Sequence, residues 1–394
     1  MIYLGDTQLN TFPLGDTQPL SAYLGSTLVW PDGTPPSPYA GQYLTFIAQE
    51  AGTFKFSGST TANTLQYSLD SGTTWTTLPH NTNSPTVQPG SSIIWKGSNL
   101  TITSARGIGR FSSSGLFYAQ GNIMSLLYGD SFTGQTSLAG KDRVNYSLFY
   151  NCTGITSAEN MILPATTLAQ HCYRIMFYGC TSLTTAPELP ATTLAEWCYY
   201  NMFQDCTSLT TAPELPATTL ANYCYQNMFV GCTSLTTAPG LPATTLADYC
   251  YNGMFQVCTS LTTAPSLPAT TLANYCYRGM FQGCTSLTTV QQTLPATTLA
   301  HNCYGGMFQD CTSLTTAPEL PATTLVQNCY DSMFYRCSYL NYVKCLATSG
   351  INTNNSTSNW LNGVSSSGTF VKASTATWPT GGNGIPTNWT VQSE

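Results

Sequence analysis

Four aromatic side chains recur every 26 residues and form the pattern of this chain that most resembles a binding site. The rings are Trp197, Tyr223, Tyr249 and Tyr275. Residues that can hydrogen-bond to hydroxyl groups directly precede three of them, and these are Asn222, Asp248 and Asn274. Aromatic faces can stack on sugar rings, so the pattern predicts a ligand-binding column for carbohydrate. The alternative is that the rings cover the ends of the repeated elements and shield the core.

Side chains suited to catalysis are scarce in this sequence. Only 7% of the 394 residues are charged, and the three histidines, His80, His171 and His301, lie far apart along the chain. The sequence contains no nucleophile elbow, zinc-protease motif, phosphate-binding glycine loop or cluster of metal ligands. We therefore expect no enzyme activity, no cofactor and no metal. The open alternative is a lyase or depolymerase whose carboxylates come together between chains.

Composition also limits the partners of the chain. The formal net charge of -6 predicts no basic patch that could neutralise phosphates, so nucleic acid is not an expected partner. No run of 18 apolar residues occurs, so membrane insertion is not expected either. The chain has no Lys or Arg before Lys55 and therefore lacks the positive start of a secretory signal. We expect it to fold in a reducing cytoplasm.

Residues 144–337 contain eight copies of one sequence unit. The clearest copies begin at Cys206 and Cys232 and read C-T-S-L-T-T-A-P-x-L-P-A-T-T-L-A-x-x-C-Y-x-x-M-F. A fixed period of 26 residues, lengthened once to 27, is typical of a solenoid whose coils bury their apolar faces on one another. Around Cys224, apolar residues at i, i+4, i+5 and i+8 predict a short helix in each coil. The following Leu-Thr-Thr-Ala run predicts a short strand.

Fifteen of the sixteen cysteines occupy two positions of this unit, and Cys345 stands alone beyond them. Within a unit the two cysteines are eight residues apart, about 12 Å along a helix, which is too far for a disulfide. Between units they form rows in which each thiol has two equivalent neighbours. Such rows suit small buried apolar side chains better than disulfide pairs or zinc ligands. We therefore expect buried, reduced thiols.

The pattern F-x-x-C-x-x-L-x-x-A-P-x-L-P-A-x-x-L resembles the BspA-like leucine-rich repeats of surface proteins from gut and oral bacteria. About half of the chain carries this pattern. Its repeat length of 26 and its second cysteine depart from the usual family pattern, so a shared fold is a stronger inference than a shared partner. The resemblance implies a ligand-binding or adhesive solenoid that is not an enzyme.

Residues 1–33 hold a second repeat, Leu-Gly-x-Thr, with a period of ten. Its anchor positions are Leu4, Gly5, Leu14, Gly15, Leu24 and Gly25. The pattern predicts short strands joined by tight turns, with too little apolar surface for a core of their own. The tandem resembles the N-terminal segments of structural proteins from phages of Bacteroides-type hosts, which implies an anchor to other virion proteins. The alternative is a hairpin folded back on its own chain.

The rest of the chain divides by composition. A proline-rich linker at 34–38 precedes β-prone runs at 39–105 that predict a small β-sandwich, and 106–143 forms a connector and the start of the solenoid cap. The solenoid is expected over 144–345 and a C-terminal capping module over 346–394. The predicted fold class is therefore α+β and β. It is a leucine-rich-repeat solenoid, with a short strand and a short helix per coil, preceded by a β-sandwich.

These features together predict a non-enzymatic phage virion protein, a tail or head fibre, that recognises a host-surface glycan or protein. We expect a homo-oligomer located in the virion after assembly in the host cytoplasm. Two alternatives stay open: a BspA-like adhesin of the bacterial cell surface, and a purely architectural virion component. If the aromatic column only packs, the recognition surface is expected around Trp360, Trp378 and Trp389.

Overall fold

The computed structural model describes residues 39–58, 65–98 and 109–394 in full. It also describes the backbone of four short strands, β1 (Ile2–Leu4), β2 (Thr7–Leu9), β3 (Tyr23–Leu24) and β4 (Thr27–Leu28). β1 pairs antiparallel with β2, and β3 pairs antiparallel with β4. Of the six anchor positions, Leu4 and Leu24 end β1 and β3, in keeping with the predicted short strands. The others, Gly5, Leu14, Gly15 and Gly25, lie outside the described residues.

Two sheets precede the repeats. Their strands are β5 (Leu44–Ala48), β6 (Phe54–Ser57), β7 (Leu65–Ser68), β8 (Thr76–Thr77), β9 (Ser92–Gly97), β10 (Arg110–Ser113), β11 (Phe117–Asn122) and β12 (Ile155–Ile162). One sheet has the order β12-β11-β5-β9-β7-β8, and β10 pairs with β6 in the other. Phe46 of β5 contacts Phe54 and Phe111 of the second sheet, with ring centroids 5.3 and 4.9 Å apart. The two sheets therefore share one aromatic core.

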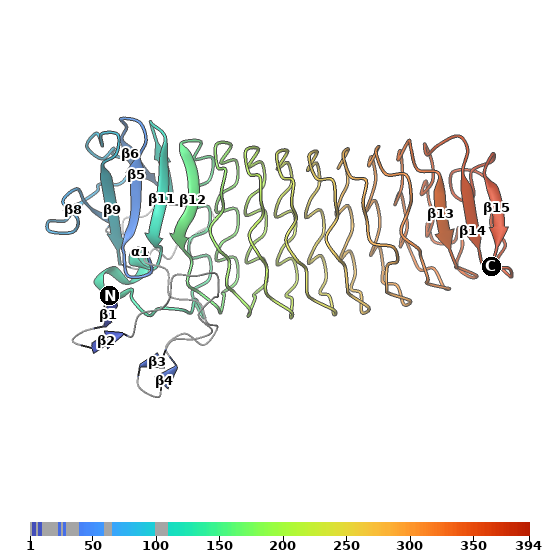
Figure 1. The fold of residues 1–394 in the computed structure, drawn as a ribbon, viewed down its shortest axis with the longest axis horizontal. Helices are drawn as coiled ribbons and strands as arrows, with labels where there is room; N and C mark the ends of the chain where they lie inside the picture. Colours follow the sequence, from blue (N-terminus) through green and yellow to red (C-terminus); the bar gives the residue numbers. More distant parts are fainter. Residues whose placement is uncertain are drawn as a thin grey trace.

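The segment expected to be a connector takes part in both sheets. It supplies β10 and β11 and continues into the helix α1 (Ser125–Tyr128) and the 3-10 helix η1 (Gly129–Ser131). β11 pairs antiparallel with β5 and parallel with β12, so the larger sheet runs on into the first coil (Figure 1). Phe149 in that coil stacks on both Phe111 and Phe177. The core is thus continuous from the sheets into the repeats.

Beyond β12 the chain forms a row of similar coils that lie side by side, shown in green to orange in Figure 1. Parallel bridges join threonines one repeat apart, for example Thr185 to Thr211 and Thr211 to Thr237. A second line of bridges includes the pair Thr193 and Thr219. Most coils hold these single bridges instead of the predicted strand, because a nearby proline has no N–H with which to extend a ladder.

The cysteine-containing segment of each coil is a ribbon of turns, so the predicted helix was wrong. Within one ribbon, the Tyr200 N–H donates to the Trp197 carbonyl at 3.4 Å. The neighbouring Tyr199 N–H instead donates to the Cys224 carbonyl of the next coil at 3.0 Å. Alternate amides therefore link adjacent coils, whereas an α-helix would satisfy all of them along its own axis. In the fully described ranges, α1 and η1 are the only helical segments.

The apolar spacing of the ribbon resembles that of a helix because two residues point inward and the next two point outward. In one copy the buried residues are Cys224, Tyr225, Met228 and Phe229. This period of four is so close to the helical 3.6 that apolar spacing alone does not separate the two structures. The backbone separates them, because every fourth residue has a positive φ, as at Asn227 (55°) and Gly231 (72°). Such residues interrupt a right-handed helix.

Val257 stands at one of these positive-φ positions, with a φ of 61° and 40% of its surface exposed. The neighbouring coils have Gly231 and Gly283 there, both also at positive φ. A β-branched residue in this conformation is strained by about 1–2 kcal/mol, which exceeds the entropic cost of glycine. We expect Val257→Gly to raise the free energy of unfolding by about 0.5–1 kcal/mol in urea denaturation.

The matched control is Val230→Gly, which replaces an outward-facing valine whose φ is not positive. There the substitution relieves no strain and should lower stability. Equal effects of the two glycine substitutions would contradict the assignment of strain to Val257.

Inside the coils, identical side chains stack in continuous rows. Successive phenylalanine rings from Phe149 to Phe334 have centroids 5.3–5.7 Å apart. A parallel tyrosine row runs from Tyr173 to Tyr330. All sixteen cysteines are buried with free thiols. The cysteine that follows the phenylalanine in each coil donates its S–H to the phenylalanine carbonyl of the preceding coil. For example, the Cys232 Sγ lies 3.1 Å from the Phe203 carbonyl oxygen.

The C-terminal segment continues this packing. β13 (Tyr342–Cys345), β14 (Thr369–Lys372) and β15 (Thr390–Ser393) form a parallel sheet in that order. Trp360 is fully buried and stacks on Tyr330 with ring centroids 6.1 Å apart, so it extends the tyrosine row. The segment therefore covers the last repeat with aromatic side chains. Among the described residues, no helix is both long and apolar enough for a membrane span.

Candidate functional site

The four rings predicted as a binding column do lie in one column, where each stacks on the next. Trp197 and Tyr223 have ring centroids 3.9 Å apart and are inclined by 6°. The separations are 4.7 Å from Tyr223 to Tyr249 and 4.4 Å from Tyr249 to Tyr275. All four side chains are partly exposed. His301 ends the column, with its Nε2 2.8 Å from the Tyr275 hydroxyl.

This stacking changes how the column could hold a ligand. At these separations each ring face is covered by the next ring, which leaves no space for a sugar between them. A ligand would therefore meet the ring edges and the phenol hydroxyls. Burial raises the pKa of Tyr249 above its ordinary value, so its hydroxyl stays a hydrogen-bond donor at neutral pH. The site offers a ridge of aromatic edges instead of a series of separate platforms.

The polar residues beside the rings form a ladder between coils. The Asn222 Oδ1 accepts a hydrogen bond from the Asp248 N–H at 3.1 Å, and the Asp248 Oδ1 accepts one from the Asn274 N–H at 2.9 Å. The Asn274 Oδ1 accepts from the His301 N–H at 3.2 Å. These oxygens therefore hold adjacent coils in register. The ligand-binding role of Asn222, Asp248 and Asn274 stays a prediction. In that role, their other polar atoms would contact the ligand.

The backbone at the rings is in a conformation that bulky residues rarely adopt. The φ angle is 62° at Trp197, 59° at Tyr223, 58° at Tyr249 and 57° at Tyr275. In the next two coils Asn302 and Asn328 stand at the equivalent position with the same sign of φ. Asparagine tolerates this conformation far better than tyrosine or tryptophan does. The backbone therefore does not account for the choice of aromatic residues.

A second outward column, which the sequence prediction missed, holds a cation among aromatic rings. The Arg174 guanidinium carbon lies 4.4 Å from the centroid of Tyr200, 5.2 Å from Trp197 and 5.7 Å from Tyr146. Tyr146, Arg174 and Tyr200 are equivalent residues of three successive coils. The Arg174 Nη1 is 3.4 Å from the His171 Nδ1. The sequence could have revealed this column, because its residues lie two positions after the first cysteine of each coil, as Tyr200 does after Cys198.

His171 stacks on Trp197 with ring centroids 6.0 Å apart, at the N-terminal end of the column. Burial, followed by the nearby charges of Arg174 and Arg143, lowers the pKa of His171. The imidazole is therefore neutral at physiological pH, and its Nδ1 can accept a hydrogen bond from Arg174. Arg174, His171 and Trp197 are therefore in mutual contact at this end of the column.

A cavity of about 330 Å³ lies in the C-terminal segment, against two of the three tryptophans named as a second possibility. Trp378, Trp389 and Ile385 line it, whereas Trp360 is buried beneath Trp378 with ring centroids 5.2 Å apart. The Trp378 Nε1 is buried and has no hydrogen-bond partner among the described residues. This cavity is concave and apolar, but it lacks the charged group and the repeated spacing of the column.

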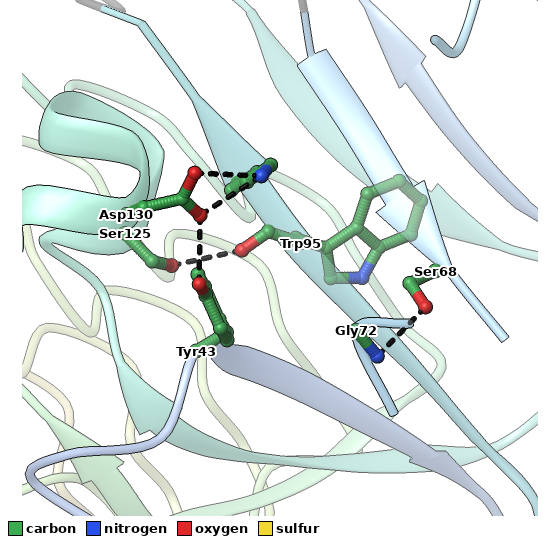
Figure 2. A network of polar contacts seen from close by, with 7 residues as sticks. Tyr43, Ser68, Gly72, Trp95, Ser125 and Asp130 are labelled. Carbon is green, nitrogen blue, oxygen red and sulfur yellow. Dashed lines mark hydrogen bonds and ion pairs between the residues drawn. The ribbon is translucent and has the colours of Figure 1, made fainter. Parts of the chain in front are cut away.

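Figure 2 shows a polar network in the N-terminal sheets that is structural in character. The Asp130 Oδ1 accepts hydrogen bonds from the Tyr43 hydroxyl at 2.7 Å and from the Lys96 Nζ at 2.8 Å. The Lys96 Nζ also lies 4.1 Å from the Trp75 ring centroid. Burial, together with Asp130, raises the pKa of Tyr43 to about 12. The network fastens η1 to the sheet, and Trp75 packs against Tyr43 with ring centroids 5.1 Å apart.

Charged residues are otherwise dispersed along the chain. Within the described ranges, no three His, Cys, Asp or Glu side chains are close enough together to hold a metal ion. The structure thus presents a row of stacked coils with an aromatic ridge, which defines a repeat protein.

The family of this repeat protein is shown by comparison with family models. The BspA type leucine rich repeat region, in six copies, matches residues 128–262 and 251–359. These matches cover more than half of the chain, which therefore belongs to the BspA-type leucine-rich repeat family.

A leucine-rich repeat protein from Bacteroides ovatus, known from its crystal structure, is 16% identical over 71% of this chain and 73% of its own, with a TM-score of 0.35. A search of curated proteins found no match.

Proposed function

We propose that this chain is a non-enzymatic adhesion protein whose repeats recognise a glycan or protein on a cell surface. The observation that carries the proposal is the column from Trp197 to Tyr275, whose rings occupy a backbone conformation that costs about 1–2 kcal/mol per residue. Folding does not require rings there, because Asn302 and Asn328 occupy the same position in later coils. Membership of the BspA-type family fits a surface role.

The coils would act as one solenoid that presents the ridge of ring edges to an extended ligand. Each contact at a ring edge is weak, so attachment would depend on several coils and on several copies of the chain. A homo-oligomer would supply such multivalency.

We propose that the protein is part of a phage virion, as a tail or head fibre. The Leu-Gly-x-Thr tandem of residues 1–33, with its short strand pairs, supports an anchor to other virion proteins. The family assignment equally favours the second candidate, an adhesin on the bacterial cell surface. Neither candidate requires nucleic-acid binding or membrane insertion of the repeats. Detection of the protein in purified virions or in the bacterial envelope separates the two.

Deletion of residues 1–33 tests the anchor. We expect the truncated protein to keep its thermal unfolding temperature, because the short strands carry too little apolar surface to support the core. Its incorporation into particles should fall below detection by immunoblotting. Normal incorporation would place the anchor elsewhere. Purified full-length protein that binds no target cell would leave only the architectural role.

A further inference from the structure

Arg174 is held in a defined plane by the rings around it. Tyr146 of the preceding coil and Tyr200 of the following coil flank its guanidinium, and Trp197 lies beside it. Its Nε is shielded from solvent and has no hydrogen-bond partner among the described residues. With its faces against rings and its Nε shielded, the guanidinium keeps the edge formed by Nη1 and Nη2 for further contacts, and Nη1 also contacts the His171 Nδ1 at 3.4 Å. That edge is the part that forms paired hydrogen bonds with a carboxylate or a sulfate.

A second arginine stands at the same end of the column. The Arg143 N–H donates to the Gln170 carbonyl, just as the His171 N–H donates to the Glu196 carbonyl one coil later. Arg143 therefore occupies the position of the aromatic column one coil before His171, and its side chain is exposed. It extends the line of rings with a positive charge.

Neither arginine is neutralised within the described parts of the chain. The ion pairs found there join Lys96 to Asp130, Arg336 to Asp310, and Lys344 to Glu319 and Glu394. Asp142 and Glu196 act electrostatically on His171, and neither is within ion-pair distance of Arg143 or Arg174. The Glu196 Oε2 instead accepts a hydrogen bond from the Gln170 Nε2 at 2.9 Å. A partly buried arginine without a counter-ion is an unusual feature in a chain with so few charges.

We propose that this end of the column binds the acidic group of a polysaccharide, with Arg174 as a fixed planar donor and Arg143 as the second charge. The inference rests on the proposed adhesive function and specifies its ligand as an acidic glycan. The aromatic edges from Trp197 onward would contact the following sugars. Uronic carboxylates and sulfate esters share the required chemistry, and the experiment distinguishes them.

The test measures binding of the full-length protein to three immobilised polymers: polygalacturonate, dextran sulfate and neutral dextran. We expect binding to at least one acidic polymer, weakened at high ionic strength, and little binding to neutral dextran. Arg174→Gln should lower the affinity by about tenfold or more, because a charged paired hydrogen bond is lost. Arg174→Lys should give an intermediate affinity, since it keeps the charge without the planar fork. The control Arg336→Gln removes an arginine already paired with Asp310 at 3.2 Å and should change nothing.

Preference for polygalacturonate identifies carboxylates as the acidic group, and preference for dextran sulfate identifies sulfates. Equal binding to neutral dextran, or unchanged affinity of Arg174→Gln, overturns the acidic-glycan inference but leaves adhesion standing. If no polymer binds while target cells do, the ligand is of another class and the inference fails. If circular dichroism shows that Arg174→Gln is unfolded, the test uses the affinity of Arg174→Lys and the salt dependence of binding by the unmodified protein. Binding that changes neither with Arg174→Lys nor with ionic strength overturns the inference.

Discussion

Replacing Tyr223, Tyr249 and Tyr275 together by asparagine is expected to abolish attachment to target cells while the protein stays folded. Asparagine is the residue found at the equivalent position in later coils, as at Asn302 and Asn328. Each lost ring contact removes about 0.5–1.5 kcal/mol of stacking, and relief of the positive-φ strain offsets it. We therefore expect a net change in unfolding free energy within about 2 kcal/mol. Loss of three successive contacts should reduce attachment by about 100-fold or more.

Flow cytometry of cells incubated with labelled protein measures this attachment, and thermal denaturation measures stability. The control is the double variant Gln256→Ala with Gln282→Ala, which alters another outward column, where the two side chains are hydrogen-bonded at 3.3 Å. It should attach normally. Attachment of the asparagine variant at the unmodified level would show that the rings only pack. The recognition surface would then be sought at the cavity beside Trp378 and Trp389.

The cysteines are expected to be inert in the folded protein and to react fully once it unfolds. Burial raises the pKa of Cys198, Cys250 and Cys284 to about 12, from an ordinary value of 9.0. At about pH 8 this lowers the reactive thiolate fraction roughly 1,000-fold, and burial blocks the reagent as well. A thiol reagent should therefore label almost none of the cysteines in native protein and close to sixteen after denaturation.

The same pKa shifts predict a loss of stability in alkali. The folded state keeps these protons up to about pH 12, whereas unfolded thiols release theirs near pH 9.0. Between these values the folded state binds more protons than the unfolded state, so stability falls as pH rises. The thiol contribution is fully present below pH 9.0 and decreases from there toward 12. A flat unfolding free energy across this window, or rapid labelling of native protein, would contradict the buried rows.

The stacked rows explain why identical residues recur at identical positions. Each phenylalanine and tyrosine ring has a copy of itself in the next coil, so one side-chain shape solves the packing problem for the whole row. The outward columns are free of this demand and vary from coil to coil. Differences among outward residues, such as Arg174 against Gln226 at equivalent positions, are therefore where binding specificity can reside.

The repeat period by itself determined which residues become neighbours. Because 26 residues make one coil, equal positions in successive units must align, and the columns of rings and cysteines follow directly from the sequence. The strand runs at residues 44–48, 54–57, 65–68 and 92–97 were also predictable, from their β-rich or alternating side chains.

Only the tertiary structure decided the form of the turn ribbon and the character of the site. The inward pattern at Cys224 and Met228 fits a helix as well as a ribbon, and hydrogen bonds between coils select the ribbon. The spacing of Tyr223 and Tyr249 did not show that their faces meet, because that depends on the coil separation and on a positive φ. Arg174 lies between rings because the coil separation brings Tyr146 and Tyr200 close to its guanidinium. Contacts between coils join residues far apart in the chain, and local sequence does not contain their energies.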